Sequence, residues 1–205
     1  MRAVRRDDLI PVIETAYKNH GGVIESEFNH GGIRTKTDSL LDGFNDYRFW
    51  YRPITHELWI APATTRPGAD CIKTKTEGAA QIQLGFWSKS HVIDIHCAGT
   101  TMAHDAFCQR PEAGCIPLIY DRLDKTGTPT GKSYSTNEAG LNVHRASVQS
   151  DVEHIGPYSE GCQVDDDHED HEQEIAAAKA SSMYQANPKY LWNYLLISVD
   201  EVTGI

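Results

Sequence analysis

A histidine and a cysteine in the last third of the chain have a spacing that suits nucleophilic catalysis. His144 is followed by fourteen residues and then by the run Ser159-Glu160-Gly161-Cys162. A catalytic cysteine needs a base, a turn that exposes its sulfur and backbone N–H groups that stabilise an oxyanion. Gly161 permits a sharp turn directly before the thiol. The spacing predicts a nucleophile and its base, and the alternatives are a small buried cysteine and a structural histidine.

Local patterns on either side position these two residues. Residues 141–146 predict a short strand, on which Asn142 and His144 share one face and Arg145 lies on the other. The loop of residues 146–160 is long enough to fold back. We therefore expect it to bring the thiol beside the imidazole.

The remainder of the chain predicts a mainly β fold with two helices. Apolar residues at helical spacing, with an aspartate cap and Pro11 in the first turn, predict a helix over residues 7–19. A second helix is expected in the alanine-rich stretch after the cysteine, ending at Asn187 and Pro188.

Alternating or continuous apolar runs predict the strands. Residues 46–53 and 56–65 should form one hairpin, and residues 79–87 and 91–97 a second pair. Single strands are expected over residues 115–122 and 189–202. The glycine pair near residue 31 precedes an expected loop up to Asn45, and the polar, turn-rich segment 123–140 predicts another loop.

Composition limits the classes of partner. The 205 residues predict one catalytic domain over residues 1–205, with residues 1–30 as a helical extension. A net charge of −10 without a basic face argues against nucleic-acid binding. No apolar run approaches about 18 residues, so no membrane insertion is expected, and the N-terminus lacks a secretory signal pattern. The five cysteines predict no disulfide framework, and the state of Cys71, Cys97, Cys108 and Cys115 stays open.

Two histidine-containing segments could suggest a metal site. The acidic run 165–171 holds two histidines three positions apart but lacks a second ligand segment, so a solvated acidic helix start is favoured. The cysteines and histidines of residues 96–108 match no zinc pattern. We predict neither a metal nor another cofactor, although His91 and His96 could line the cleft.

The block from His144 to Cys162 resembles the motif of the L,D-transpeptidase catalytic domain, the YkuD-like family. That motif is a histidine, a spacer of similar length and then Ser/Thr-His-Gly-Cys. The runs ATTRPG at 63–68 and GLNVHRA at 140–146 are similar to a divergent phage and bacterial branch with an SxGCQV motif. The resemblance implies a β-sandwich or barrel-like domain with a helix packed against it.

The resemblance also implies a reaction. Cys162 would attack a peptidoglycan stem peptide and form a thioester, with His144 as base and its other ring nitrogen held by a backbone carbonyl. The N–H groups of Gly161 and Cys162 would help to form the oxyanion hole, and Ser159 would shape the turn. Water would then give carboxypeptidase or endopeptidase activity, and an amine acceptor would give transpeptidation.

This chain departs from the family motif at two positions. Glu160 stands where the family has histidine, and Val164 stands where it has arginine or asparagine. Anchoring of the substrate would then fall to Arg145 and Gln163, because a guanidinium forks well onto a carboxylate. The residues expected at the substrate are Arg145, Gln163, Glu160, Tyr158 and Asn142.

These expectations combine into one hypothesis with alternatives. The chain would be a monomeric cysteine peptidase that cleaves stem peptides or cross-links of peptidoglycan, namely a phage endolysin. It would be made in the host cytoplasm and act in the periplasm or cell wall after release. The alternatives are a cross-linking L,D-transpeptidase, a secreted antibacterial effector and a non-catalytic virion or binding module.

Overall fold

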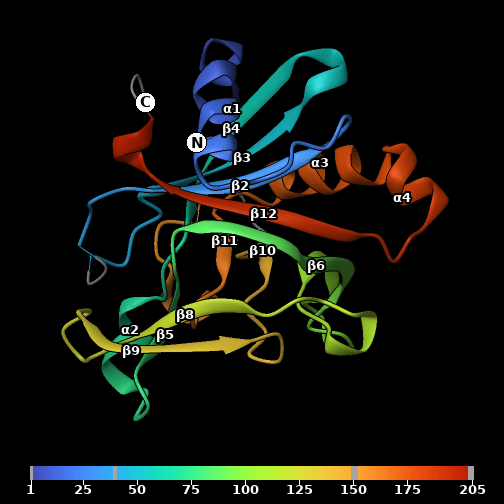
Figure 1. Cartoon of the computed structure of the whole chain (residues 1–205). Coiled ribbons are helices and arrows are strands. Elements are labelled where there is room, and N and C mark those ends of the chain that lie inside the picture. The colour runs from blue at the N-terminus through green and yellow to red at the C-terminus, as the bar shows by residue number, and fades with distance from the viewer. Residues whose placement is uncertain (1, 39–40, 149–151, 203–205) are drawn as a thin grey trace.

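Eight strands close into a barrel in the computed structural model, which describes residues 2–38, 41–148 and 152–202. The strands are β2 (Asn29–Arg34), β3 (Asp46–Arg52), β4 (Glu57–Thr64), β6 (Gly85–His96), β7 (His104–Cys108), β10 (Val143–Arg145), β11 (Gln163–Asp165) and β12 (Leu191–Ser198). Their order is β4-β11-β10-β7-β6-β12-β2-β3, and β3 pairs back onto β4 to close the ring (Figure 1). The short strand β1 (Val4–Arg5) pairs antiparallel with β4 at Trp59 and Ile60. The mainly β fold expected from the sequence is confirmed.

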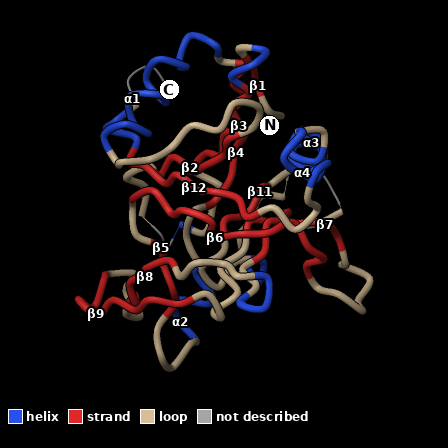
Figure 2. Tube along the Cα trace, turned by 45° about the vertical axis from the view of Figure 1, so that its right-hand side comes forward, coloured by secondary structure: helices blue, strands red, loops and turns tan. Residues whose placement is uncertain are grey.

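A second, smaller sheet lies at one end of the barrel. It contains β5 (Ala79–Ile82), β8 (Leu118–Leu123) and β9 (Pro129–Thr136), all antiparallel. The short helix α2 (Ala69–Thr74) lies beside it. Both views place this sheet and α2 at the end of the molecule opposite α1 (Ile10–Asn19) (Figures 1 and 2).

Helix α1 covers one face of the barrel strands. Helix α1 packs its apolar residues, including Ile13 and Tyr17, against barrel residues such as Phe49 and Leu195. Its first turn contains Pro11 as expected, but the expected aspartate cap is wrong. Asp7 instead accepts a hydrogen bond from the Leu58 backbone at 3.0 Å, because the preceding strand runs beside β4.

Two further helices follow the cysteine, where the sequence predicts one. They are α3 (His168–Lys179), whose cap Asp167 accepts from Glu169 N at 2.8 Å, and α4 (Ser182–Ala186). Among the residues that the structure describes, no helix has both the length and the apolar character needed to cross a bilayer.

Several strand assignments from the sequence are wrong. Residues 79–87 and 91–97 do not pair, because β6 runs unbroken from Gly85 to His96 while β5 joins β8 in the other sheet. The expected loop 123–140 contains β9. Strands β2 and β7 lie in segments for which the sequence predicted no strand.

The glycine pair in β2 has a packing function rather than a turn function. A Cβ on Gly31 would collide with the Leu195 carbonyl oxygen of the neighbouring strand β12. A Cβ on Gly32 would lie 2.6 Å from the Tyr194 hydroxyl. Small residues are therefore needed in this strand, which was not predicted from the sequence.

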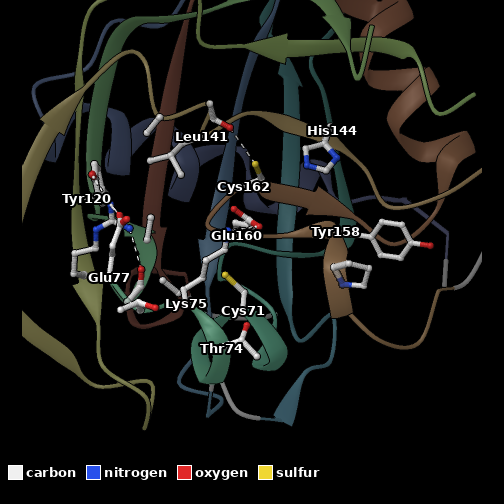
Figure 3. Close-up of a pocket in the computed structure, with 18 of the residues that line it drawn as sticks. Cys71, Thr74, Lys75, Glu77, Tyr120, Leu141, His144, Tyr158, Glu160 and Cys162 are labelled. Atoms are coloured by element: carbon white, nitrogen blue, oxygen red, sulfur yellow. Dashed lines mark hydrogen bonds and ion pairs between the residues drawn. The ribbon is translucent and has the colours of Figure 1, made fainter. Parts of the chain in front are cut away.

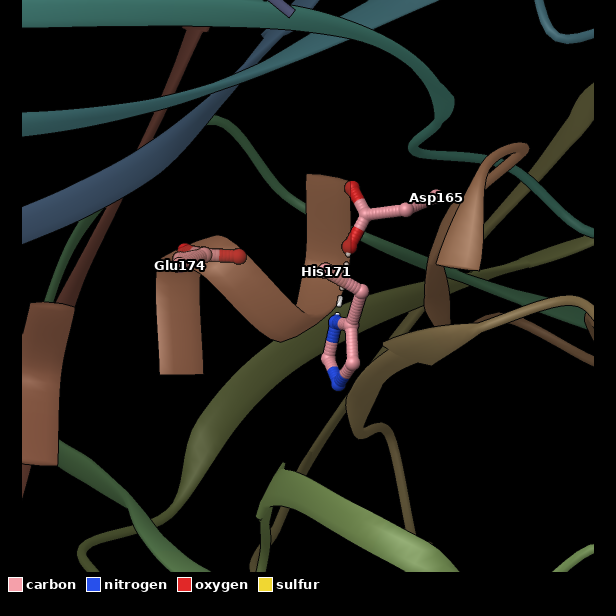
Figure 4. A group of neighbouring side chains, drawn as sticks. All are labelled: Asp165, His171 and Glu174. Atoms are coloured by element: carbon pink, nitrogen blue, oxygen red, sulfur yellow. Dashed lines mark hydrogen bonds and ion pairs between the residues drawn. The ribbon is translucent and has the colours of Figure 1, made fainter. Parts of the chain in front are cut away.

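Buried charges connect α3 to the barrel. Arg48 is fully buried and donates to Asp165 Oδ2 at 3.3 Å and to Glu174 Oε1. His171 Nδ1 lies 2.9 Å from Asp165 Oδ2 (Figure 4). His30 Nδ1 lies 3.0 Å from Glu174 Oε1. Burial raises the pKa of Glu174, and the Arg48 guanidinium opposes this rise.

This network corrects the expectation of a solvated acidic run at 165–171. Asp165, Asp167 and His171 are buried, because they face the barrel and the helix start rather than water. The ligand atoms of Asp165, His171 and Glu174 lie within 4.8 Å of one another, as in a metal site. The Arg48 guanidinium already contacts both carboxylates, so the group contains its own cation.

Removal of Arg48 tests the role of this network in stability. Arg48→Ala leaves two carboxylates buried without their cation, and we expect the free energy of unfolding to fall by about 3–5 kcal/mol. Arg52→Ala on the same strand removes a half-exposed pair with Glu57 and should cost at most about 1 kcal/mol. Urea unfolding of both variants measures the difference. Equal losses would contradict the structural role of the buried network.

Candidate active site

Parallel pairing of β10 with β11 places the predicted nucleophile beside its predicted base. The register aligns His144 with Val164, and Gln163 N donates to Asn142 O at 2.8 Å. Continued by one residue, this register sets Cys162 opposite Asn142. Cys162 and His144 line the same pocket, of about 670 Å³ (Figure 3).

The loop between β10 and β11 was expected to fold back towards β10. The structure places the end of this loop, at the turn before Cys162, next to the start of β10. Residues 149–151 of this loop lie outside the described part of the chain. A short 3-10 helix (Gly156–Tyr158) precedes the turn that carries the cysteine.

Ser159 and Gly161 shape the turn before the thiol. Gly161 has a φ of +139°, and a Cβ there would lie 2.7 Å from the Ala80 carbonyl oxygen. Ser159 Oγ accepts from Gly161 N at 3.2 Å and donates to Cys162 O at 2.9 Å. Glycine is therefore required by both the backbone and the neighbouring strand.

The run 63–68, which the sequence also singles out, holds this turn in place. Gly68 N, at the end of this run, donates to Ser159 O at 2.9 Å. Ala80 N, from strand β5, donates to Glu160 O at 3.3 Å and holds the same turn from the small sheet. Gly68 is also the residue that starts α2. The two segments that carry the family resemblance thus contact each other through backbone hydrogen bonds.

The Cys162 thiol is buried and protonated at neutral pH. Its exposed fraction is 9%, and Sγ donates to Gly140 O at 3.3 Å. Burial raises the pKa of Cys162 to about 12; the Asn142 backbone opposes the rise and Glu160 adds to it. Because the thiolate is the reactive form, the resting thiol needs a base to become a nucleophile.

His144 lines the same pocket, and its hydrogen bond defines its tautomer. Its Nδ1 lies 2.8 Å from Arg145 O, and since a carbonyl only accepts, Nδ1 carries the proton and Nε2 keeps its lone pair. This is the backbone-carbonyl contact expected from the resemblance. Burial, followed by the nearby His96, holds the pKa of His144 well below its ordinary value. The resting pair is therefore a neutral thiol and a neutral imidazole, not an ion pair.

Of the two other histidines expected near the cleft, one lines the pocket. The His96 ring stacks on His144, with centroids 4.1 Å apart. His91 is fully buried elsewhere, where its ring nitrogens lie 2.8 Å from Ser90 Oγ and 3.0 Å from Leu141 O.

The predicted substrate-binding residues divide into two groups. Tyr158 and Glu160 line the pocket with the thiol. Arg145 lines a different cavity, beside His104, because it lies on the opposite face of β10 from His144. Gln163 is buried in the barrel, where its side chain accepts from the Tyr194 hydroxyl at 3.1 Å.

Asn142 acts from behind the pocket rather than within it. Its Oδ1 accepts from Gln109 N at 2.9 Å, and its Nδ2 donates to His96 Nδ1 at 3.1 Å. It therefore orients a histidine that lines the pocket.

Two basic side chains that were not predicted from the sequence, Lys75 and Arg122, also line the pocket. Lys75 follows α2 and pairs with Glu160 at 2.7 Å. Arg122 on β8 donates to Gly78 O at 2.9 Å and lies over the Tyr120 ring, 5.1 Å from its centroid. No local pattern links these residues to the cysteine, since the small sheet brings them there only on folding.

Thiol labelling tests the protonation state derived for Cys162. All five cysteines are free, and Cys97 is exposed. With iodoacetamide near neutral pH we expect Cys97 to react first and Cys162 slowly, because the buried Cys162 is almost entirely thiol. Peptide mass mapping over time measures both rates, and unfolding in guanidinium should make all five react. A Cys162 that reacts ahead of Cys97 would show a resting thiolate and contradict the neutral pair.

Comparisons with family models, with curated proteins and with solved structures found no match to this chain. The geometry of the pocket and the motif in the sequence are therefore the features of this chain that bear on its function.

Proposed function

We propose that this protein is a cysteine peptidase that cleaves peptidoglycan stem peptides or their cross-links through a thioester. The observation that carries the proposal is that the Cys162 thiol and the His144 imidazole, with its free Nε2, line one pocket. Acyl transfer through a covalent intermediate requires at least a nucleophile and an oriented base in one pocket.

The reaction follows from the protonation states. Cys162 Sγ attacks the substrate carbonyl carbon while His144 Nε2 takes the thiol proton, which makes a tetrahedral oxyanion and an imidazolium. The carbon–nitrogen bond breaks, and the leaving amine takes the proton from His144. Water then attacks the thioester and gives its proton to His144, and this proton returns to the departing Cys162 sulfur.

The oxyanion is assigned to a single backbone amide of the turn. Gly161 N–H donates to Ser159 Oγ within the turn, so it is already engaged. The N–H of Cys162 is the remaining amide of the two expected from the resemblance, and we assign the oxyanion to it.

The choice of substrate rests on the motif from His144 to Cys162, and the pocket is compatible with it. Lys75, Glu160 and Arg122 give the pocket charges of both signs, which suits a peptide with charged side chains and termini. Hydrolysis is favoured over transfer because Val164, where the family has a polar residue, is buried beside the thiol and cannot hold a substrate. A phage endolysin released to the cell wall is the biological setting that we propose.

Lysis of outer-membrane-permeabilised cells tests this proposal. We expect the wild-type protein to reduce turbidity, and Cys162→Ala and His144→Ala to lower the rate by at least about a hundredfold. Cys97→Ser is the matched control, since it removes an exposed thiol outside the pocket and should retain activity.

Equal lysis by the wild type and Cys162→Ala would rule out cysteine chemistry. Binding of cells without lysis would indicate the non-catalytic module. Product masses from purified muropeptides distinguish hydrolysis from transpeptidation, because only the latter joins two stem peptides.

A further inference from the structure

His96 is a second imidazole in the pocket, brought from a strand that the sequence motif does not include. It ends β6, where it pairs with His104 of β7. Its ring lies against the ring of His144, with centroids 4.1 Å apart and planes 19° apart. It also lines the pocket that contains Cys162.

Hydrogen bonds fix the orientation of this second ring. Asn142 Oδ1 accepts from the Gln109 backbone at 2.9 Å, so the amide must turn its Nδ2 towards His96 Nδ1, 3.1 Å away. An amide NH₂ only donates, so His96 Nδ1 accepts and the ring proton lies on Nε2. The backbone of the neighbouring strand thus determines both the position and the tautomer of His96.

We propose that His96 is a positioning residue for the base: its anchored ring covers one face of His144 and holds that imidazole with its free Nε2 directed to the reaction. This inference rests on the proposed function of Cys162 and His144 and adds a residue to that site. A ring that is covered on one face and held through Nδ1 by Arg145 O has little freedom to turn away.

His96 lies in the same pocket as Glu160, the residue that departs most from the family motif. The family has an imidazole directly before the Gly-Cys pair, where this chain has Glu160. The Glu160 side chain is largely exposed and pairs with Lys75 at 2.7 Å. His96 supplies a second imidazole to the same pocket from β6.

Stacking has an electrostatic consequence, because two imidazoles in contact cannot both take a proton without repulsion. The titratable groups that act on His144 include His96, His104 and His171, and those that act on His96 include Arg110 and His171. Removing His96 leaves His144 with fewer competing charges. His144 should then take up its proton at a higher pH.

Imidazole NMR of the free protein tests this directly. In wild type, the ¹⁵N shifts of His144 should report protonation at Nδ1 only. In His96→Phe, which keeps an aromatic ring but cannot titrate, the protonation midpoint of His144 should move to higher pH. His56→Phe changes an exposed histidine outside the pocket and should leave the midpoint unchanged.

Kinetics on muropeptides give the second readout. His96→Ala should lower kcat by about ten- to hundredfold with little change in KM, and His96→Phe should recover most of this loss because it restores the covering ring. The acid limb of the rate profile should move to higher pH in both variants.

The outcomes separate this inference from the proposed function. A His96→Ala variant in which the ¹⁵N shifts and the titration of His144 are identical to those of wild type would overturn the positioning role, whatever the activity of the protein. A shifted titration in a protein without peptidase activity would support the pairing of the two rings and reject only the proposed function.

Discussion

The parallel pairing of β10 with β11 is the constraint on which the site depends. It sets Cys162 opposite Asn142 and so fixes how far the thiol can lie from His144, two residues further along the same face. Because the two strands are parallel, the connecting segment has to cross from the end of β10 back to the start of β11 at the opposite end of the pair. The turn at Ser159 and Gly161 is held by backbone hydrogen bonds from Gly68 and β5. The barrel pairing therefore sets the relative position of the two strands, and the end of the loop shapes the turn before the thiol and contributes Tyr158 and Glu160 to the pocket.

Burial determines the chemistry that this geometry allows. It raises the pKa of the Cys162 thiol and lowers that of the His144 imidazole, so both groups are driven towards their neutral forms. A thiolate–imidazolium pair is therefore disfavoured before substrate binds. In the reaction that we propose, His144 therefore acts as a general base and proton transfer accompanies attack, so the orientation of its Nε2 is decisive.

The sequence predicted the mainly β fold, because most barrel strands bury one or both faces and show it in their hydrophobic pattern. It did not predict β9, whose residues are nearly all exposed and carry no such pattern. The spacing in the motif also predicted that Cys162 and His144 belong to one site, and both line the same pocket. Lys75 and Arg122 could not be found in this way, since only the packing of α2 and the small sheet brings them to the pocket. The position of Arg145, in contrast, could be predicted from the sequence. Alternation along the strand places its side chain on the opposite face from His144, and it lines a different cavity.

The central claim is that Cys162 forms a covalent acyl-enzyme with the help of His144. Intact-protein mass spectrometry after rapid mixing with purified muropeptides, followed by peptide mapping, tests it most directly. The account predicts a transient acyl adduct on Cys162 of the wild type, labile to hydroxylamine as a thioester is, and no adduct on Cys162→Ala. An adduct on any other cysteine, or turnover of muropeptides by Cys162→Ala, would contradict it.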